Sequence, residues 1–109
     1  MEYKTAIILC GGKGTRLGSI AKKLPKTLVK IQNKEILWYI INFLKTKEFN
    51  HFILPLGYKS NLIRKYIKKN NSFGTNIDLI NTGINTNIGK RIYKVIKQIK
   101  SEHLLILNG

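Results

Sequence analysis

The chain has 109 residues, 43% of them hydrophobic and 23% charged, so it can form one packed domain over residues 1–109 but not two. Twenty Lys and Arg residues against five Asp and Glu residues give a formal net charge of +15. A single cysteine and two histidines exclude a disulfide framework and disfavour a zinc centre. The sequence has neither an apolar run of about 20 residues nor the layout of a signal peptide, so we expect a cytoplasmic protein and no membrane partner.

The basic charge by itself favours acidic partners such as nucleic acid, an anionic surface or phosphorylated ligands. However, 17 of the 20 basic residues are Lys, whereas reading of bases and bidentate capture of phosphate favour Arg. A chain rich in Lys, Asn and Ile is also what an A/T-rich coding sequence produces without selection for a partner. We therefore do not expect nucleic acid to be the main partner.

The first half of the chain predicts a strand, a loop and a helix. Thr5–Cys10 is a continuous apolar run, typical of a strand buried on both faces of a parallel sheet. Residues 13–34 are mostly loop, with a short apolar stretch at 28–31 and a polar turn at 32–34. From Glu35 to about Thr46 apolar residues recur every three or four positions, which predicts a helix with Glu35 in its first turn.

The alternation of predicted strand and helix then repeats. Residues 51–56 predict a second strand, and Ser60 is a candidate N-cap for a second amphipathic helix. A third strand is expected at residues 76–80, a loop at 81–87, a third helix at about 88–100 and a fourth strand at 104–107. The order βαβαβαβ predicts an α/β fold of the Rossmann-like, three-layer kind, a mostly parallel sheet with helices on both faces.

The loop after the first strand is the most informative segment. Its sequence, Gly11-Gly12-Lys13-Gly14-Thr15-Arg16, offers unobstructed backbone N–H groups and two cations, which suit a polyphosphate. It lacks the spacing of a Walker A loop. It is not a dinucleotide fingerprint either, because Leu17 occupies the third glycine position and the second strand ends in Leu56-Gly57 without an acid.

Three blocks in order carry a more specific signal: Ile8-Leu9-Cys10-Gly11-Gly12-Lys13-Gly14-Thr15-Arg16-Leu17, Leu24-Pro25-Lys26-Thr27-Leu28-Val29 and Lys34-Glu35-Ile36-Leu37. Together they resemble the N-terminal signature of the sugar-1-phosphate nucleotidylyltransferases. Residues 82–92 are similar to the loop and helix start of the glucose-1-phosphate cytidylyltransferase branch. The resemblance covers the whole chain as the N-terminal portion of such an enzyme.

The resemblance implies transfer of a nucleotidyl group, cytidylyl by preference, from a nucleoside triphosphate to a sugar 1-phosphate with release of pyrophosphate. Such chemistry needs positioning and positive charge more than an acid–base pair. By the family pattern, the catalytic cations are Arg16 and Lys26. The implied nucleotide-binding residues are Cys10, Gly11, Gly12, Gly14, Thr15, Arg16, Thr82, Gly83 and Gly89. CTP is the favoured donor, and UTP, GTP and dTTP stay open.

Two departures from the family bear on these expectations. Thr27 and Glu35 stand where the family commonly has proline. The family's Mg²⁺-binding aspartate follows the position of Gly109, so the resemblance implies a Mg²⁺ cofactor, no metal ligand within these residues and a truncated chain. Binding of nucleotide without catalysis and catalysis by this chain itself both stay open. Exposed sheet edges would then favour homo-oligomers. The alternative is a non-catalytic basic α/β module that binds nucleic acid or an acidic partner through the Lys-rich segment at 90–100.

Overall fold

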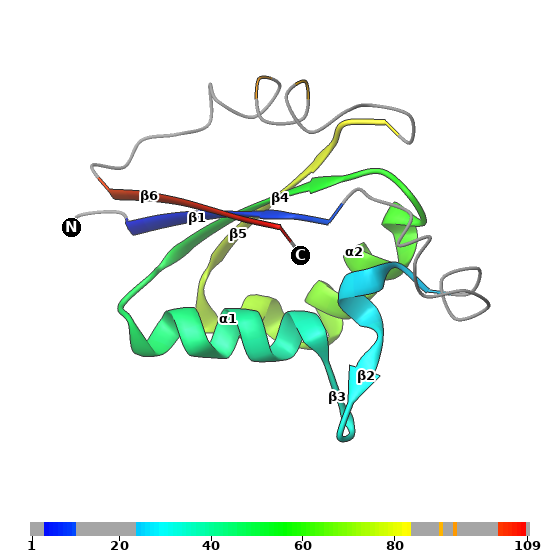
Figure 1. Cartoon of the computed structure of the whole chain (residues 1–109), viewed down its shortest axis with the longest axis horizontal. Coiled ribbons are helices and arrows are strands. Elements are labelled where there is room, and N and C mark those ends of the chain that lie inside the picture. Colours follow the sequence, from blue (N-terminus) through cyan, green and yellow to red (C-terminus); the bar gives the residue numbers. More distant parts are fainter. Residues whose placement is uncertain (1–3, 11–23, 84–89, 91–92, 94–102, 109) are drawn as a thin grey trace.

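The computed structural model describes residues 4–10, 24–83, 90, 93 and 103–108. Four strands form the main sheet, two short strands form a hairpin, and two α-helices pack against the sheet (Figure 1). In chain order the elements are β1 (Lys4–Leu9), the 3-10 helix η2 (Lys26–Leu28), β2 (Lys30–Ile31), β3 (Lys34–Glu35), α1 (Ile36–Thr46), β4 (His51–Leu56), α2 (Ser60–Lys69), the 3-10 helix η3 (Asn71–Gly74), β5 (Asn76–Asn81) and β6 (His103–Asn108).

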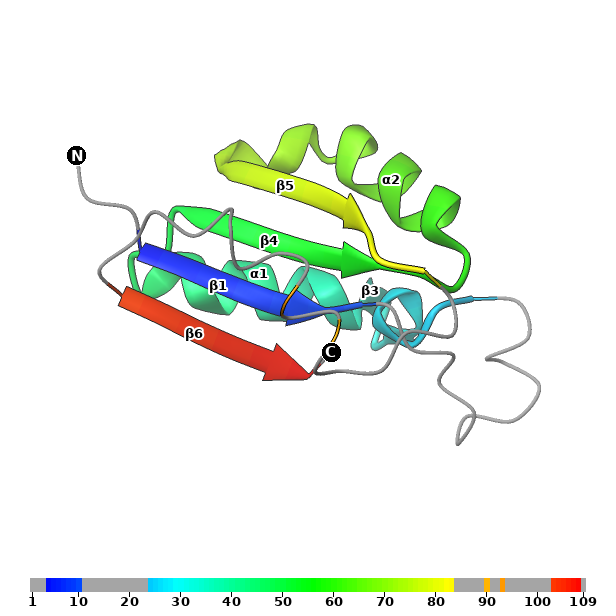
Figure 2. The ribbon, with the colours of Figure 1, turned by 90° about the horizontal axis from the view of Figure 1, so that it is seen from above.

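The main sheet has the strand order β5-β4-β1-β6, and every neighbouring pair in it is parallel. Viewed from above the sheet, the four strands lie side by side and point the same way (Figure 2). The chain therefore builds outward from β1 to β4 and β5, and then returns to the other side of β1 to form β6. This confirms the predicted mostly parallel α/β sheet.

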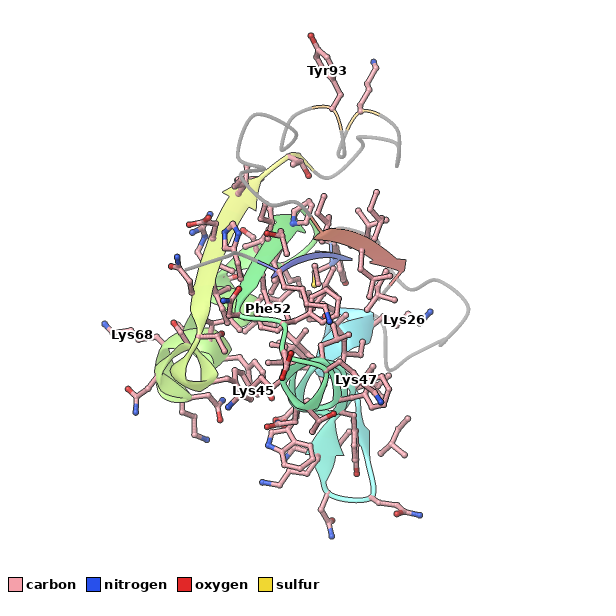
Figure 3. All side chains as sticks on the ribbon, turned by 90° about the vertical axis from the view of Figure 1, so that its left-hand side faces the viewer. Lys26, Lys45, Lys47, Phe52, Lys68 and Tyr93 are labelled. Atoms are coloured by element: carbon pink, nitrogen blue, oxygen red, sulfur yellow. The ribbon has the colours of Figure 1, made fainter. Side chains whose placement is uncertain are left out.

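Helices α1 and α2 both cover the same face of the sheet (Figure 1). The larger core cluster lies between them and the strands, with Phe52 of β4 pointing into it (Figure 3). Its fully buried members include Ala6 and Ile8 of β1, Leu37 and Ile41 of α1, and Ile63 of α2. Alternate residues of a strand point to opposite faces, so the even-numbered residues of β1 face the helices.

The opposite face of the sheet carries a second, smaller cluster formed by Ile7, Leu9 and Ile53, with Ile80 packed against it. Ile7 and Ile53 are fully buried, so β1 is covered on both faces, as its continuous apolar run predicts. The predicted third helix, which would supply a layer here, lies outside the described residues except for Lys90 and Tyr93, which are helical. Helices on both faces therefore stay a prediction.

The structure corrects two local predictions. Ser60 is the first residue of α2 and not its N-cap; the N-cap is Lys59, in the left-handed region at φ 51°, and its side chain makes no capping hydrogen bond. Glu35 precedes α1 as its N-cap, with extended backbone, and does not belong to the first turn. None of the described helices is long and apolar enough to cross a membrane.

Candidate functional site

The strand order creates a reversal point between β1 and β6. In open parallel sheets, ligands bind at the carboxyl ends of the strands where the winding direction reverses. Here β1 and β6 are paired over six residues, from Lys4 opposite His103 to Leu9 opposite Asn108. The glycine-rich segment begins directly after Cys10, at the carboxyl end of β1. The segment singled out by the sequence thus starts at the place where the topology puts a ligand site.

The carboxyl ends of β1 and β4 lie beside this point. Their register runs only from Thr5 opposite His51 to Ile7 opposite Ile53. Pro55 has no N–H to continue a ladder, and only the N–H of Cys10 reaches its carbonyl, at 3.3 Å. This hydrogen bond keeps β1 joined to β4 at the carboxyl edge of the sheet, next to the start of the glycine-rich segment.

Thr82 and Gly83 lie at the same edge, directly after β5. The backbone N–H of Thr82 donates to the carbonyl of Leu56 at 2.7 Å, and its hydroxyl donates to the same carbonyl at 3.0 Å. Thr82 is 1% exposed. Gly83 follows with φ 94°, a left-handed conformation that favours glycine, and its N–H donates to the side chain of Asn81. The predicted binding residues after β5 are thus held against the end of β4.

Cys10 and Lys26 are joined to this edge through Thr27. The thiol of Cys10 is buried within the core cluster, so a ligand can meet this residue only through its backbone. Burial raises the pKa of this thiol to about 12, and the neighbouring Thr27 hydroxyl opposes the rise. Thr27 and its neighbour Leu28 are buried, whereas Lys26 is exposed. The buried residues therefore fix η2 beside the end of β1 and leave the ammonium group of Lys26 in solvent.

The hairpin after η2 is anchored on both sides. Gln32 and Asn33 form its turn with φ 50° and 75°, and the N–H of Ile36 donates to the carbonyl of Val29 at 2.9 Å. Burial raises the pKa of the Tyr66 phenol of α2 above its usual range, and the neighbouring Glu35 carboxylate of β3 adds to the rise. Sequence reasoning did not find this contact, nor the one between Thr27 and Cys10, because both depend on tertiary packing.

Lys26 is separated from the basic surface of α2. The exposed cations of that helix are Arg64, Lys65, Lys68 and Lys69. Figure 3 shows Lys26 and Lys68 projecting from opposite sides of the molecule. Of the other predicted site residues, Gly11, Gly12, Gly14, Thr15, Arg16 and Gly89 lie outside the described residues, so their roles stay predictions.

The described residues do not fit a Mg²⁺ site. They contain no cluster of three or more His, Cys, Asp or Glu side chains that could hold a metal ion. Asp78 is the single aspartate of the sequence, and its carboxylate lies 2.8 Å from Nε2 of His51, whose Nδ1 is 3.0 Å from the Thr5 hydroxyl. Because Mg²⁺ usually takes one or two carboxylates besides substrate phosphates, a donor set for it is not present in the part of the chain that is described.

Comparison with known proteins decides the family. Residues 5–109 match the family described as Nucleotidyl transferase. The chain belongs to this family. It is 38% identical over 104 residues to the D-glycero-alpha-D-manno-heptose 1-phosphate guanylyltransferase of Campylobacter jejuni, covering 95% of this chain and 46% of that protein. It is 34% identical to the "Probable glucose-1-phosphate cytidylyltransferase" of Bacillus subtilis, covering 95% of this chain and 49% of that protein.

Solved structures share the fold of this chain. HddC from Yersinia pseudotuberculosis, crystallised with GMP-PN, superposes with a TM-score of 0.82 at 30% identity over 96% of this chain and 47% of that one. The inositol-1-phosphate CTP transferase from T. maritima shares the fold, with a TM-score of 0.81 at 19% identity. The chain thus spans about half the length of the relatives it matches. The comparisons thus show membership of the nucleotidyl transferase family and do not support the non-catalytic basic module.

Proposed function

We propose that this chain forms the nucleotide-binding half of a sugar-1-phosphate nucleotidylyltransferase, which transfers a nucleotidyl group from a nucleoside triphosphate to a sugar 1-phosphate and releases pyrophosphate. The observation that carries the proposal is the position of the glycine-rich segment, which follows β1 at the reversal point of the strand order. Membership of the nucleotidyl transferase family supports it independently.

In the proposed reaction, a phosphate oxygen of the sugar phosphate attacks the α-phosphorus of the triphosphate. The bond from that phosphorus to the bridging oxygen breaks, and pyrophosphate leaves with the electron pair. Negative charge is spread over phosphoryl oxygens at the transition state, so cations and N–H donors in fixed positions lower the barrier. Lys26 is suited to this as an exposed point charge on a short helix whose neighbours are buried. Arg16 would clamp two phosphate oxygens.

Thr82 and Gly83 would flank the base. Their backbone is fixed by hydrogen bonds to Leu56 and Asn81, so the surface they present changes little when a nucleotide binds. Preformed donors and acceptors save the ordering entropy that a mobile loop would lose. Because the side chain of Thr82 already contacts Leu56, its first role is to hold the end of β5 against β4.

CTP is the first candidate donor, since the loop after β5 resembles that of glucose-1-phosphate cytidylyltransferases and a relative at 34% identity carries that name. GTP is the second, because the relative at 38% identity is named a guanylyltransferase and HddC was crystallised with GMP-PN. Mg²⁺ would neutralise charge on the phosphates when bound. No group of side chains that could hold it is found among the described residues.

The test is calorimetric titration of the 109-residue chain with CTP, GTP, UTP and dTTP in moderate salt, with and without Mg²⁺. We expect CTP or GTP to bind at least tenfold more tightly than the others. Arg16→Ala should weaken that binding by about 10- to 100-fold, the contribution of a charge-assisted contact of about 1.5–3 kcal/mol.

Arg64→Ala is the matched control. It removes the same charge from the exposed surface of α2, away from the proposed site. If Arg64→Ala and Arg16→Ala weaken binding equally, or if all four triphosphates bind equally and salt abolishes the binding, the interaction is with the general basic surface and the proposed site is wrong.

A further inference from the structure

Two buried hydroxyl groups have no hydrogen-bond partner in the described part of the chain: Oγ1 of Thr27 in η2 and Oη of Tyr66 in α2. Thr27 is 1% exposed, and the ring of Tyr66 packs against the main core and against Phe73. A buried hydroxyl without a partner has lost its hydration and gained nothing in return, which destabilises the folded chain. In folded proteins such groups are few, and each calls for an explanation.

Each of these hydroxyls neighbours a polar side chain of another element. Thr27 lies beside the Cys10 thiol at the end of β1, and Tyr66 lies beside the Glu35 carboxylate of β3. Within each pair the groups are close enough for one to shift the pKa of the other, yet neither hydroxyl is in hydrogen-bond geometry with its neighbour. A small displacement would therefore convert either pair into a hydrogen bond.

The two pairs stand at opposite ends of one stretch of chain, residues 26–35, which we call the Lys26 segment. It consists of η2 and the hairpin of β2 and β3. Its backbone is bonded internally: the N–H of Val29 donates to the carbonyl of Lys26 at 3.1 Å, and the carbonyl of Val29 accepts the N–H of Ile36 at 2.9 Å. The segment can therefore shift as a unit, and the exposed side chain of Lys26 shifts with it.

We propose that Thr27 and Tyr66 are positioning residues for Lys26, and that their hydroxyls gain partners when a phosphate group binds at Lys26. Attraction between the phosphate and the ammonium group shifts the Lys26 segment slightly. The Thr27 hydroxyl then forms a hydrogen bond with the Cys10 thiol, and the Tyr66 hydroxyl donates to the Glu35 carboxylate. The proposal rests on the proposed function, because it requires Lys26 to contact the triphosphate.

This arrangement links the two hydroxyls to ligand affinity. The ligand-free chain carries two buried hydroxyls without partners and the bound chain carries none, so the difference adds to the free energy of binding. Tyr66 gains a charged acceptor and contributes more, whereas Thr27 gains a thiol, which is a weak partner. Removing either hydroxyl should therefore weaken binding without lowering the stability of the ligand-free chain. A merely structural role would lower the stability instead.

The test combines urea unfolding of the ligand-free 109-residue chain with calorimetric titration by inorganic triphosphate and by the preferred nucleoside triphosphate. Tyr66→Phe keeps the ring and should weaken binding of both about tenfold, and Thr27→Val should weaken it about threefold. Neither change should lower the urea midpoint. Thr27→Ser keeps the hydroxyl and should bind as the unmodified chain does. Tyr93→Phe, at a residue that is 72% exposed, is the matched control for loss of a phenol.

Near-ultraviolet difference absorbance gives a second readout, because inorganic triphosphate does not absorb in the tyrosine band. A phenol that begins to donate to a carboxylate absorbs at longer wavelength. The unmodified chain should show this shift on saturation with inorganic triphosphate, and Tyr66→Phe should lack it.

Two results overturn the proposal. A lower urea midpoint for ligand-free Tyr66→Phe would mean that the hydroxyl already has a partner, and unchanged affinity in both Tyr66→Phe and Thr27→Val would mean that neither hydroxyl acts on Lys26. If nucleoside triphosphates still bind in a manner that depends on Arg16, the proposed function stands and this inference alone fails. If the unmodified chain binds neither inorganic nor nucleoside triphosphate, both fail.

Discussion

The hydroxyl of Thr82 donates a 3.0 Å hydrogen bond to the main-chain carbonyl of Leu56, and so fastens the segment after β5 to the end of β4. The same carbonyl accepts the backbone N–H of Thr82 at 2.7 Å. The two residues are 26 positions apart in sequence, and both follow or end a strand at the carboxyl edge. This double contact holds one wall of the proposed nucleotide site.

Replacing this hydroxyl should cost a measurable part of the folding free energy. Thr82→Val removes the side-chain donor but keeps the shape, and the Leu56 carbonyl still accepts the backbone N–H, so no buried group is orphaned. We expect a loss of about 1 kcal/mol, measured by urea unfolding. Thr82→Ser keeps the hydroxyl and should lose clearly less. A loss for Thr82→Ser as large as that for Thr82→Val would mean that the methyl group matters as much as the hydrogen bond.

Lys26 should matter for triphosphate binding and not for folding, because its side chain is exposed. If the proposed function is correct, Lys26→Ala weakens binding of the preferred triphosphate by about tenfold, or about 1.4 kcal/mol, in calorimetric titration. Lys30→Ala is the matched control, since Lys30 is exposed on β2 four residues away. An equal loss in both variants would assign the effect to the overall charge.

The sheet and its helices could be predicted because their signals are local. Apolar runs predicted the strands at 5–10, 51–56 and 76–80 to within a residue or two, and a spacing of three and four predicted α1. The fourth strand was found in the same way, and the structure extends it at both ends to His103–Asn108. Strand order was not predicted, because nothing in a single strand states which neighbour it pairs with.

The features that the sequence did not predict share one physical cause: they depend on backbone conformation and tertiary contacts that residue preferences do not determine. Side-chain preference favours Ser as an N-cap, but the start of α2 is set by the left-handed turn at Lys59, so Ser60 enters the helix. In the candidate site, the sequence indicated Cys10, Lys26 and Thr82 but not why they are held in place. The contacts of Thr27 with Cys10 and of Thr82 with Leu56 are tertiary, and no spacing in the sequence encodes them.

The sheet face opposite the helices carries a row of polar side chains, Thr5, His51 and Asp78. We expect these side chains to contribute unequally to the free energy of unfolding. Thr5 is fully buried, and its hydroxyl meets Nδ1 of His51 at 3.0 Å, whereas the side chain of Asp78 is 45% exposed. His51→Phe removes a partner from a buried hydroxyl and should cost about 2 kcal/mol in urea unfolding. Asp78→Ala should cost less than about 1 kcal/mol, because solvent screens the half-exposed pair.

The double variant Thr5→Val/His51→Phe sharpens this prediction. With both polar groups replaced by apolar groups of similar shape, no buried hydroxyl lacks a partner, so the pair should cost less than the sum of the single changes. Strict additivity would show that Thr5 and His51 do not stabilise one another.

The Cys10 thiol gives the protein a defined dependence on alkaline pH. Burial raises its pKa from 9.0 to about 12, so between these values the unfolded chain releases a proton that the folded chain retains. Stability from this group is therefore complete below pH 9 and is lost as pH rises toward 12, at no more than about 1.4 kcal/mol per pH unit.

Cys10→Ala lacks the group, so its stability relative to the unmodified chain should improve from pH 8 to pH 10. Urea unfolding of both proteins at each pH measures the difference, in which the Lys and Tyr titrations common to both cancel. Parallel pH profiles would show that the thiol ionises alike in the folded and unfolded states.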